Sequence, residues 1–254
     1  MSDVRASLVA VGCLLRGVPL FFCAAPKTPL RVLCVLALDT VHALRHARPL
    51  PWRRLCELAT FLDFQACTNA AVDHKDLCEA EYRAIRQWLE EAGLGAWVEA
   101  YLGRLRELEG RRPPIGGDHR RFDEVRSYRE AVARLSFATV TGIALDAECL
   151  EEAIRATHGD GDLEALCRIA MQCQIIDDAL DYAEDLAAGL PSFLTASASL
   201  PHAMAWTAEA ARSYGAVRGS SSGRAAWPVR MALRAVTAAT SLSVLAAHRR
   251  LGPA

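Results

Sequence analysis

Apolar residues recur at helical spacing along almost the whole chain, and this feature constrains the fold most. No segment alternates apolar and polar residues in the way that a half-buried strand does. Alanine, leucine and arginine dominate, and all three favour helices. The pattern therefore predicts an all-α fold. Clusters of proline and glycine divide it into helices, which we place at 28–47, 51–76, 79–92, 94–109, 121–145, 147–157, 162–187, 201–214 and 225–249.

The length and the apolar content predict one domain over residues 1–254. With 254 residues, 52% of them hydrophobic, the chain can bury a sizeable core. Three long predicted helices, at 51–76, 121–145 and 162–187, are apolar over much of their circumference. Such helices are typical of central elements that other helices surround. We therefore expect a single-domain helical bundle around a central apolar cavity.

Charge and targeting signals narrow the function classes. The net charge is -1 and the arginines are scattered, which argues against nucleic acid as a partner. The nine cysteines contain no CxxC pair and are expected to be reduced core residues. Arg16 precedes the apolar stretch at 18–25 and Pro19 interrupts it, so we expect no signal peptide. No run reaches the ~20 apolar residues of a membrane span, which predicts a cytoplasmic protein without stable membrane insertion.

An acidic run interrupts the apolar helix predicted at 162–187. Its members all fall on one helix face at 3.6 residues per turn, and like charges four apart repel. The nearest basic residues along the chain are Arg168 and Arg212, so the compensating charge must come from elsewhere. A solvated acidic face is one explanation, and hard divalent cations are the other. The apolar flanks favour the cations, Mg²⁺ or Mn²⁺. The run consists of Asp177, Asp178, Asp181, Glu184 and Asp185.

A second polar group lies on the helix predicted at 51–76. Gln65, Asn69, Asp73 and Asp76 share one face of that helix. Two polar faces of this kind could meet across a cavity. Taken alone, however, this group is better explained as a solvated helix surface.

The acidic run and its flanks resemble a motif of a known superfamily. The segment DDALDYAED at 177–185, followed by Gly189 and Phe193, resembles the second aspartate-rich motif of the squalene and phytoene synthase superfamily. The resemblance is closest to its bacterial large terpene synthases of the tetraprenyl-curcumene synthase type. The segment QIIDDALD at 174–181 is also similar to the second motif of the trans-polyprenyl diphosphate synthases.

The first motif of the superfamily has a weaker counterpart. Asn69-x-x-x-Asp73 is similar to its D-x-x-x-D, with asparagine where the family has aspartate. Residues 82–85, YRAI, resemble the family's residues C-terminal to that motif. The segment SFATVTGIA at 136–144 lies where the family has a small-residue helix break.

The resemblance implies an isoprenoid-synthase-like fold and two groups of metal ligands that hold a prenyl diphosphate through Mg²⁺ or Mn²⁺. Asp73, with Asn69 and Asp76, would form the first group. Under this resemblance the second group is Asp177, Asp181 and Asp185, with Asp178 and Glu184 as further or alternative ligands. The resemblance also implies that the catalytic residues are Asp73, Asp177 and Asp181. It further implies that Arg212 and Tyr214 contact the diphosphate.

The activity that we predict is that of a Mg²⁺-dependent class I terpene synthase, a carbon–oxygen lyase that cyclises or eliminates from one prenyl diphosphate. One alternative is a prenyltransferase that joins two prenyl diphosphates, and another is a non-catalytic helical partner subunit. Joining two diphosphates asks for many basic residues, yet no Lys or Arg lies between Arg168 and Arg212. A homodimer is compatible with each reading.

Overall fold

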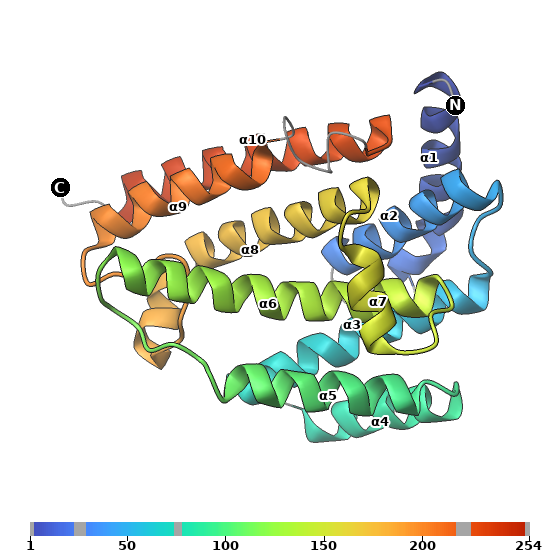
Figure 1. Ribbon diagram of the computed structural model, residues 1–254, viewed down its shortest axis with the longest axis horizontal. Helices are drawn as coiled ribbons and strands as arrows, with labels where there is room; N and C mark the ends of the chain where they lie inside the picture. Colours follow the sequence, from blue (N-terminus) through green and yellow to red (C-terminus); the bar gives the residue numbers. More distant parts are fainter. Residues whose placement is uncertain (1–2, 23–28, 74–77, 217–224, 252–254) are drawn as a thin grey trace. The chain divides into compact units, whose positions relative to one another are not determined.

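The computed structural model describes residues 3–22, 29–73, 78–216 and 225–251 (Figure 1). Every regular element in these residues is a helix, so the all-α prediction is confirmed. The elements are α1 (Asp3–Gly17), the short 3₁₀ helix η1 (Val18–Phe22), α2 (Pro29–His46), α3 (Trp52–Val72), α4 (Glu79–Glu91), α5 (Gly95–Glu109), α6 (His119–Ala144), α7 (Leu150–Thr157), α8 (Gly161–Ala188), α9 (Leu200–Gly215) and α10 (Trp227–Leu251).

The nine predicted helices correspond to α2 through α10, mostly within a few residues at each end. The prediction is wrong at the N-terminus, where α1 forms although no helix was expected. The signal was present, because Val4, Leu8, Val11 and Leu15 follow the i, i+4, i+7, i+11 spacing of one helix face. The helix predicted at 51–76 begins at Trp52 and ends at Val72.

The helices belong to two compact units. The first contains α1 to α4, most of α5, the C-terminal part of α6, and α7. The second contains the end of α5, the N-terminal part of α6, α8, α9 and nearly all of α10. The acidic run predicted on α8 therefore lies in the second unit, and the Asn69–Asp73 pair lies in the first.

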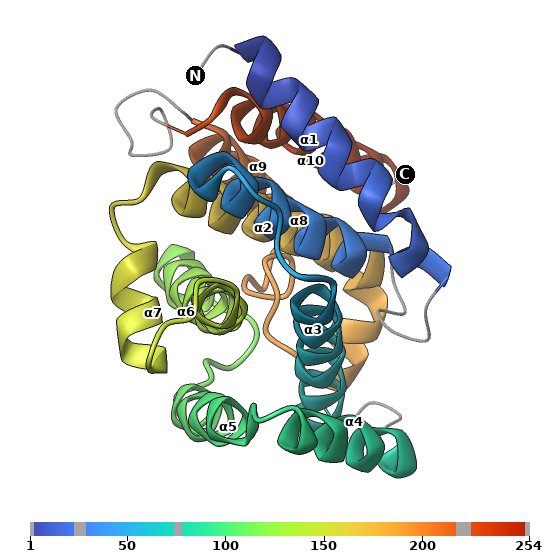
Figure 2. The same cartoon turned by 90° about the vertical axis from the view of Figure 1, so that its right-hand side faces the viewer.

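Aromatic side chains form the core of the first unit around α3. α3 packs against α2 and α4, and Figure 2 shows these three helices in succession. Phe61, Phe64 and Tyr101 are fully buried and meet edge to face, with 5.7 Å between the two phenylalanine rings. Tyr82 of α4 stacks on Phe64 at 5.5 Å. This packing fixes the C-terminal end of α3, where the first polar group lies.

The small-residue segment 136–144 is part of an unbroken helix. α6 runs from His119 to Ala144, so the helix break that the resemblance implied is not found there. The small residues serve close packing instead. At Gly142 an added Cβ would overlap the ring of Trp97 and lie 2.6 Å from the Cβ of Ala153.

Gly142→Ala is therefore expected to destabilise the protein by about 1–3 kcal/mol through overpacking. This loss should appear even though alanine is favoured over glycine inside a helix by about 1 kcal/mol. The matched control is Gly103→Ala in α5, where an added Cβ meets no atom within 4 Å and should stabilise slightly. Denaturant unfolding of both variants gives the measurement. A stabilising effect at both positions would contradict the packing assigned to Gly142.

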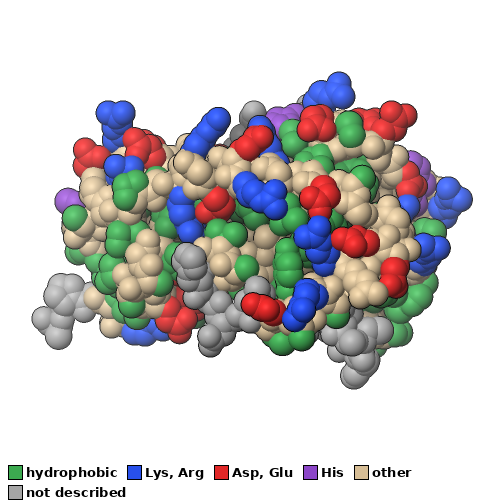
Figure 3. Space-filling model, turned by 90° about the horizontal axis from the view of Figure 1, so that it is seen from below, with side chains coloured by type: hydrophobic (Ala, Val, Ile, Leu, Met, Phe, Trp, Pro, Cys, Tyr) green, Lys and Arg blue, Asp and Glu red, His purple; other side chains and the backbone are tan. Residues whose placement is uncertain are grey.

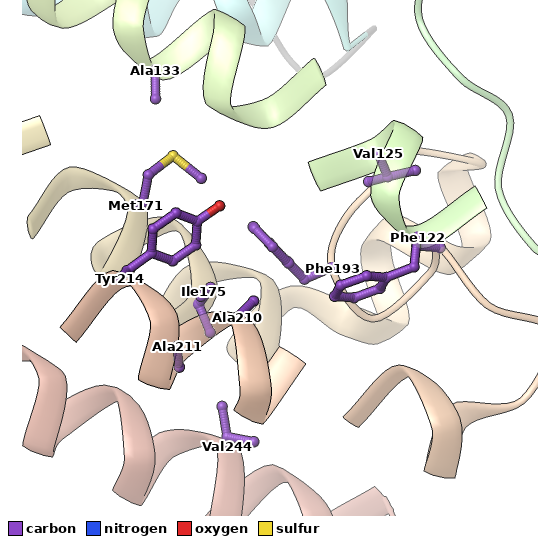
Figure 4. Close-up of a cluster of buried hydrophobic side chains, with 11 residues drawn as sticks. Phe122, Val125, Ala133, Met171, Ile175, Phe193, Ala210, Ala211, Tyr214 and Val244 are labelled. Carbon is purple, nitrogen blue, oxygen red and sulfur yellow. The ribbon is translucent and has the colours of Figure 1, made fainter. Parts of the chain in front are cut away.

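The core of the second unit joins α6, α8, α9 and α10 (Figure 4). Ile175 of α8 and Phe193 of the following segment are fully buried, and the Phe193 ring lies 5.9 Å from that of Phe122. In Figure 4 Met171 and Ile175 project from α8 toward Tyr214 and Ala211 of α9. This core determines which side of α8 is turned inward.

Capping fixes both ends of α8. Asp160 is the N-cap, and its side chain accepts a hydrogen bond from the backbone N of Leu163 at 3.0 Å. Gly189 ends the helix in the left-handed conformation at φ 66°, which glycine adopts without steric cost. The chain then turns back, and residues 190–196 are buried. This return brings Phe193 beside the acidic run.

Candidate functional site

The carboxylates of α8 occupy two different environments. Asp177 and Glu184 are exposed and Asp181 is half-buried, whereas Asp178 and Asp185 are buried. The reason is geometric. Successive residues of a helix are rotated by about 100°, so the five carboxylates spread over a broad sector of the helix circumference and do not all share one environment. One edge of the predicted face therefore meets water, and the other is turned into the protein.

Asp178 is held inside the second unit by two donors. It is 2% exposed, and its Oδ1 forms an ion pair with the guanidinium of Arg129 on α6. Its Oδ2 accepts a hydrogen bond from the backbone N of Phe193 at 2.7 Å. Both contacts donate to the carboxylate and stabilise its ionised form. The side chain therefore joins three parts of the unit: α6, α8 and the segment after Gly189.

Burial has the largest single effect on the pKa values of Asp178 and Arg129. Burial raises the pKa of Asp178, while the charge of Arg129 and the Phe193 amide oppose the rise. For Arg129, burial lowers the pKa, but Asp178 and then Asp185 raise it, and the net direction is upward. Arg129 thus supplies the compensating charge for the inner carboxylates of α8. No basic residue near them in sequence reveals it, because Arg129 comes from another helix.

Gln174 adds an oxygen to the same side of α8. It precedes Asp178 by four residues and Asp181 by seven, so the three lie along one helix face. Its Oε1 is buried and has no hydrogen-bond partner among the residues that the structure describes. A buried amide oxygen without a hydrogen-bond partner is unusual. Sequence reasoning places this glutamine within the motif and gives it no role.

The first polar group lies at the C-terminal end of α3. Asn69 and Asp73 are both half-buried, and Asp73 is the C-cap, with its backbone N donating to the Asn69 carbonyl at 2.9 Å. Gln65 is directed elsewhere, since its Nε2 donates to the Ser136 carbonyl at 3.1 Å. Asp76 lies outside the described residues. Within the first unit, Asn69 and Asp73 are thus the predicted ligands whose placement is known.

The two residues predicted to contact diphosphate lie in different surroundings. Arg212 is exposed on α9, whereas Tyr214 is buried. The Tyr214 hydroxyl donates to Glu130 and accepts a hydrogen bond from Nε of Arg126 at 3.1 Å. Burial, together with Glu130, raises the pKa of Tyr214. The hydroxyl is therefore engaged within the protein, and Arg212 alone presents its side chain to solvent.

Tyr214 belongs to a polar cavity of about 190 Å³ in the second unit. Ion pairs line it: Arg134 and Arg168 both contact Glu164, at 3.4 and 3.2 Å. Burial raises the pKa of the Cys167 thiol to about 11, so this cysteine stays protonated at neutral pH. The complete lining is Arg126, Glu130, Arg134, Glu164, Cys167, Arg168, Met171, Ser213 and Tyr214. This cavity is charged, and the central apolar cavity predicted from the sequence stays a prediction.

In the described part of the chain, no three His, Cys, Asp or Glu side chains come together as a ready-made metal site. On the molecular face drawn in Figure 3, acidic and basic side chains are intermixed.

Comparison with protein-family models, with curated proteins and with solved structures finds no match to this chain.

Proposed function

We propose that this chain is a Mg²⁺-dependent class I terpene synthase, which ionises one prenyl diphosphate and yields a cyclised or eliminated product. The observation that carries the proposal is that the carboxylates of α8 differ in their partners and in their exposure. Asp178 is committed to Arg129, while Asp177 and Asp181, one turn apart, face the exposed side and its border. Two carboxylates one helical turn apart are suited to a cation that a substrate helps to bind.

The residues fit Mg²⁺ by donor chemistry. Mg²⁺ takes oxygen ligands and is usually bound by one or two carboxylates together with water and substrate phosphates. Asp177 and Asp181 supply such carboxylates, and the unpartnered Oε1 of Gln174 is a further oxygen on the same side. A group of three protein ligands is therefore not required. Asn69 and Asp73, which belong to the first compact unit, are the donors of the other proposed ligand group.

When bound, the metal ions would stabilise the negative charge that develops on the departing diphosphate. The chain's own residues hold the acidic face in position for this. The positive charge of Arg129 offsets the negative charge of Asp178, and this weakens the electrostatic repulsion that Asp178 exerts on Asp177 and Asp181. The Asp178–Phe193 hydrogen bond keeps the following segment against α8.

The arginines around α8 favour one diphosphate over two. Three of them, Arg126, Arg134 and Arg168, form ion pairs with Glu130 or Glu164. The guanidinium of Arg129 is likewise paired, with Asp178. Basic groups that are already engaged by carboxylates are poorly placed to hold a second diphosphate. This supports a cyclase or eliminating enzyme rather than one that couples two substrates.

Release of diphosphate from a series of short to long prenyl diphosphates is expected to require Mg²⁺ or Mn²⁺ and to stop in EDTA. Excess Mg²⁺ added afterwards should restore it, because the chelator removes the cation and leaves the fold intact. Product analysis gives the second readout. Undiminished turnover in EDTA would remove the metal from the proposal, and a product with twice the carbon count of a single labelled substrate would indicate coupling.

A further inference from the structure

α10 has one face packed into the second unit and another that is apolar and exposed. Its inner side is fixed to α8 by Gln172, whose Nε2 donates to Thr237 at 3.2 Å and whose carbonyl accepts from Thr240 at 3.3 Å. On the other side Leu242 is 68% exposed and Leu245 is 47% exposed, with Met231 also exposed. The buried residues of the helix are Val229, Leu233, Thr240, Val244 and Ala247.

Small apolar residues extend this outer face along most of the helix. At about 100° per residue, the alanines fall within about 60° of Leu242, on the same side as Met231 and Leu245. They are Ala235, Ala238, Ala239 and Ala246, all exposed. We call Met231, Leu242, Leu245 and these four alanines the outer face of α10. An apolar strip of this length on a soluble surface indicates a partner.

The burial of α10 distinguishes it from a core helix. Trp227–Leu251 is long and apolar enough to cross a membrane by length and composition, yet only 22% of its most apolar window is buried. Its inner side is committed to α8, however, and Arg230 and Arg234 lie within the helix. A helix with one side packed into a protein and the other apolar is suited to lie along a surface rather than to span it.

The charge of α10 indicates the kind of surface. Every ionisable side chain in the helix is basic, and the helix carries no Asp or Glu. Arg234 and Arg249 are exposed and have no acidic partner in the part of the chain that the structure describes. By helical register, Arg249 falls on the outer face and Arg234 at its edge. The complete set is Arg230, Arg234, His248, Arg249 and Arg250.

We propose that the outer face of α10 binds the surface of a bilayer that contains anionic lipids. Leu242, Leu245 and Met231 would enter the boundary between headgroups and acyl chains, and Arg234 and Arg249 would contact lipid phosphates. A second copy of the chain is a poorer occupant. Two outer faces brought together would set arginine against arginine without an acidic residue on either helix.

This inference goes beyond the proposed catalytic function and does not depend on it. The residues involved lie on α10, and the proposed metal ligands that the structure describes lie on α8 and at the C-terminal end of α3. Binding to vesicles can be measured with neither prenyl diphosphate nor divalent metal present. Failure of one proposal therefore leaves the other untouched.

The experiment is co-sedimentation of the full chain with vesicles of phosphatidylcholine alone and of phosphatidylcholine with phosphatidylglycerol. Binding is expected only with the anionic vesicles and should weaken as salt increases. Arg234→Gln and Arg249→Gln should each weaken binding about fivefold. The double variant Leu242→Ser/Leu245→Ser should weaken it about tenfold or more through lost apolar contact. Circular dichroism and unchanged thermal unfolding establish that each variant is folded.

Two matched controls make the test specific to α10. Leu8→Ser/Leu15→Ser removes two leucines from α1 that are at least as exposed as Leu242 and Leu245, and Arg120→Gln/Arg155→Gln removes exposed arginines from α6 and α7. Both controls should bind like the unaltered chain. Absence of binding to anionic vesicles, equal binding to neutral ones, or an equal loss in the controls would overturn the proposal. So would a concentration-dependent dimer that Leu242→Ser/Leu245→Ser dissociates without any vesicle binding.

Discussion

Asp178→Ala is expected to lower the free energy of unfolding by about 3 kcal/mol, because it leaves the Arg129 guanidinium without its carboxylate. The substitution also removes the acceptor of the Phe193 amide. Arg129 is 24% exposed, so water reaches part of it, and the loss falls at the lower end of the range for broken buried pairs. Chemical denaturation, followed by circular dichroism, measures the change.

The neighbouring residue supplies the control for this prediction. Asp177 is exposed, so Asp177→Ala should change stability by less than about 0.5 kcal/mol. A double-mutant cycle with Arg129→Leu and Asp178→Leu isolates the pair. The double variant should lose clearly less than the sum of the two single variants, because no unpaired charge is left behind. If Asp178→Ala unfolds at the same denaturant concentration as Asp177→Ala, the pair does not stabilise the fold.

For turnover we expect the substitutions with little effect on stability to have a large effect. Asp177→Ala and Asp181→Ala are each expected to lower kcat for diphosphate release by at least about a hundredfold, while the fold stays intact. The reason is that each carboxylate is a proposed ligand on the accessible side of α8 and makes little contribution to the core. Release of inorganic diphosphate from the best substrate in the prenyl diphosphate series gives the rate.

The control for turnover is Glu209→Ala, which removes an exposed carboxylate from α9 in the same unit. It should leave kcat unchanged within about twofold, as expected for a surface substitution away from any site. A loss equal to that of Asp177→Ala would indicate a general effect of charge. If Asp177→Ala unfolds the protein, and Mg²⁺ has no effect on the thermal unfolding of the unaltered chain, the acidic face is structural.

Helical periodicity predicts most of the fold, and its failures have physical reasons. The helices α2 to α10 are marked by apolar spacing together with proline and glycine breakers. α1 is the exception: its Val4–Leu8–Val11–Leu15 stripe has helical spacing, but the stripe is exposed in the structure and contributes nothing to a buried core. Residues 136–144 continue α6, in agreement with the helix predicted at 121–145, and the family's helix break is absent there because Gly142 packs closely against Trp97.

For the candidate site, sequence predicts which residues share a face and does not predict what each one meets. The five carboxylates of α8 are adjacent in register, but burial separates Asp178 and Asp185 from Asp177 and Glu184. Arg129 lies 49 residues from Asp178 in the chain, and only the packing of α6 on α8 brings them together. Tyr214 likewise finds Glu130 at a separation of 84 residues. Contacts between residues so far apart in the sequence produce no periodic pattern along the chain.

The interleaving of the two compact units has a consequence for biosynthesis. Neither unit is a continuous stretch of chain, since both draw on α5 and α6, and the second also needs α10 near the C-terminal end. On the ribosome, α8 therefore emerges before the helix that supplies Thr237 and Thr240 to its Gln172. Its apolar side remains without that partner until α10 has been synthesised. The second unit cannot reach its final packing before α10 is available, and apolar surface that is left uncovered in the meantime makes a nascent chain prone to aggregation.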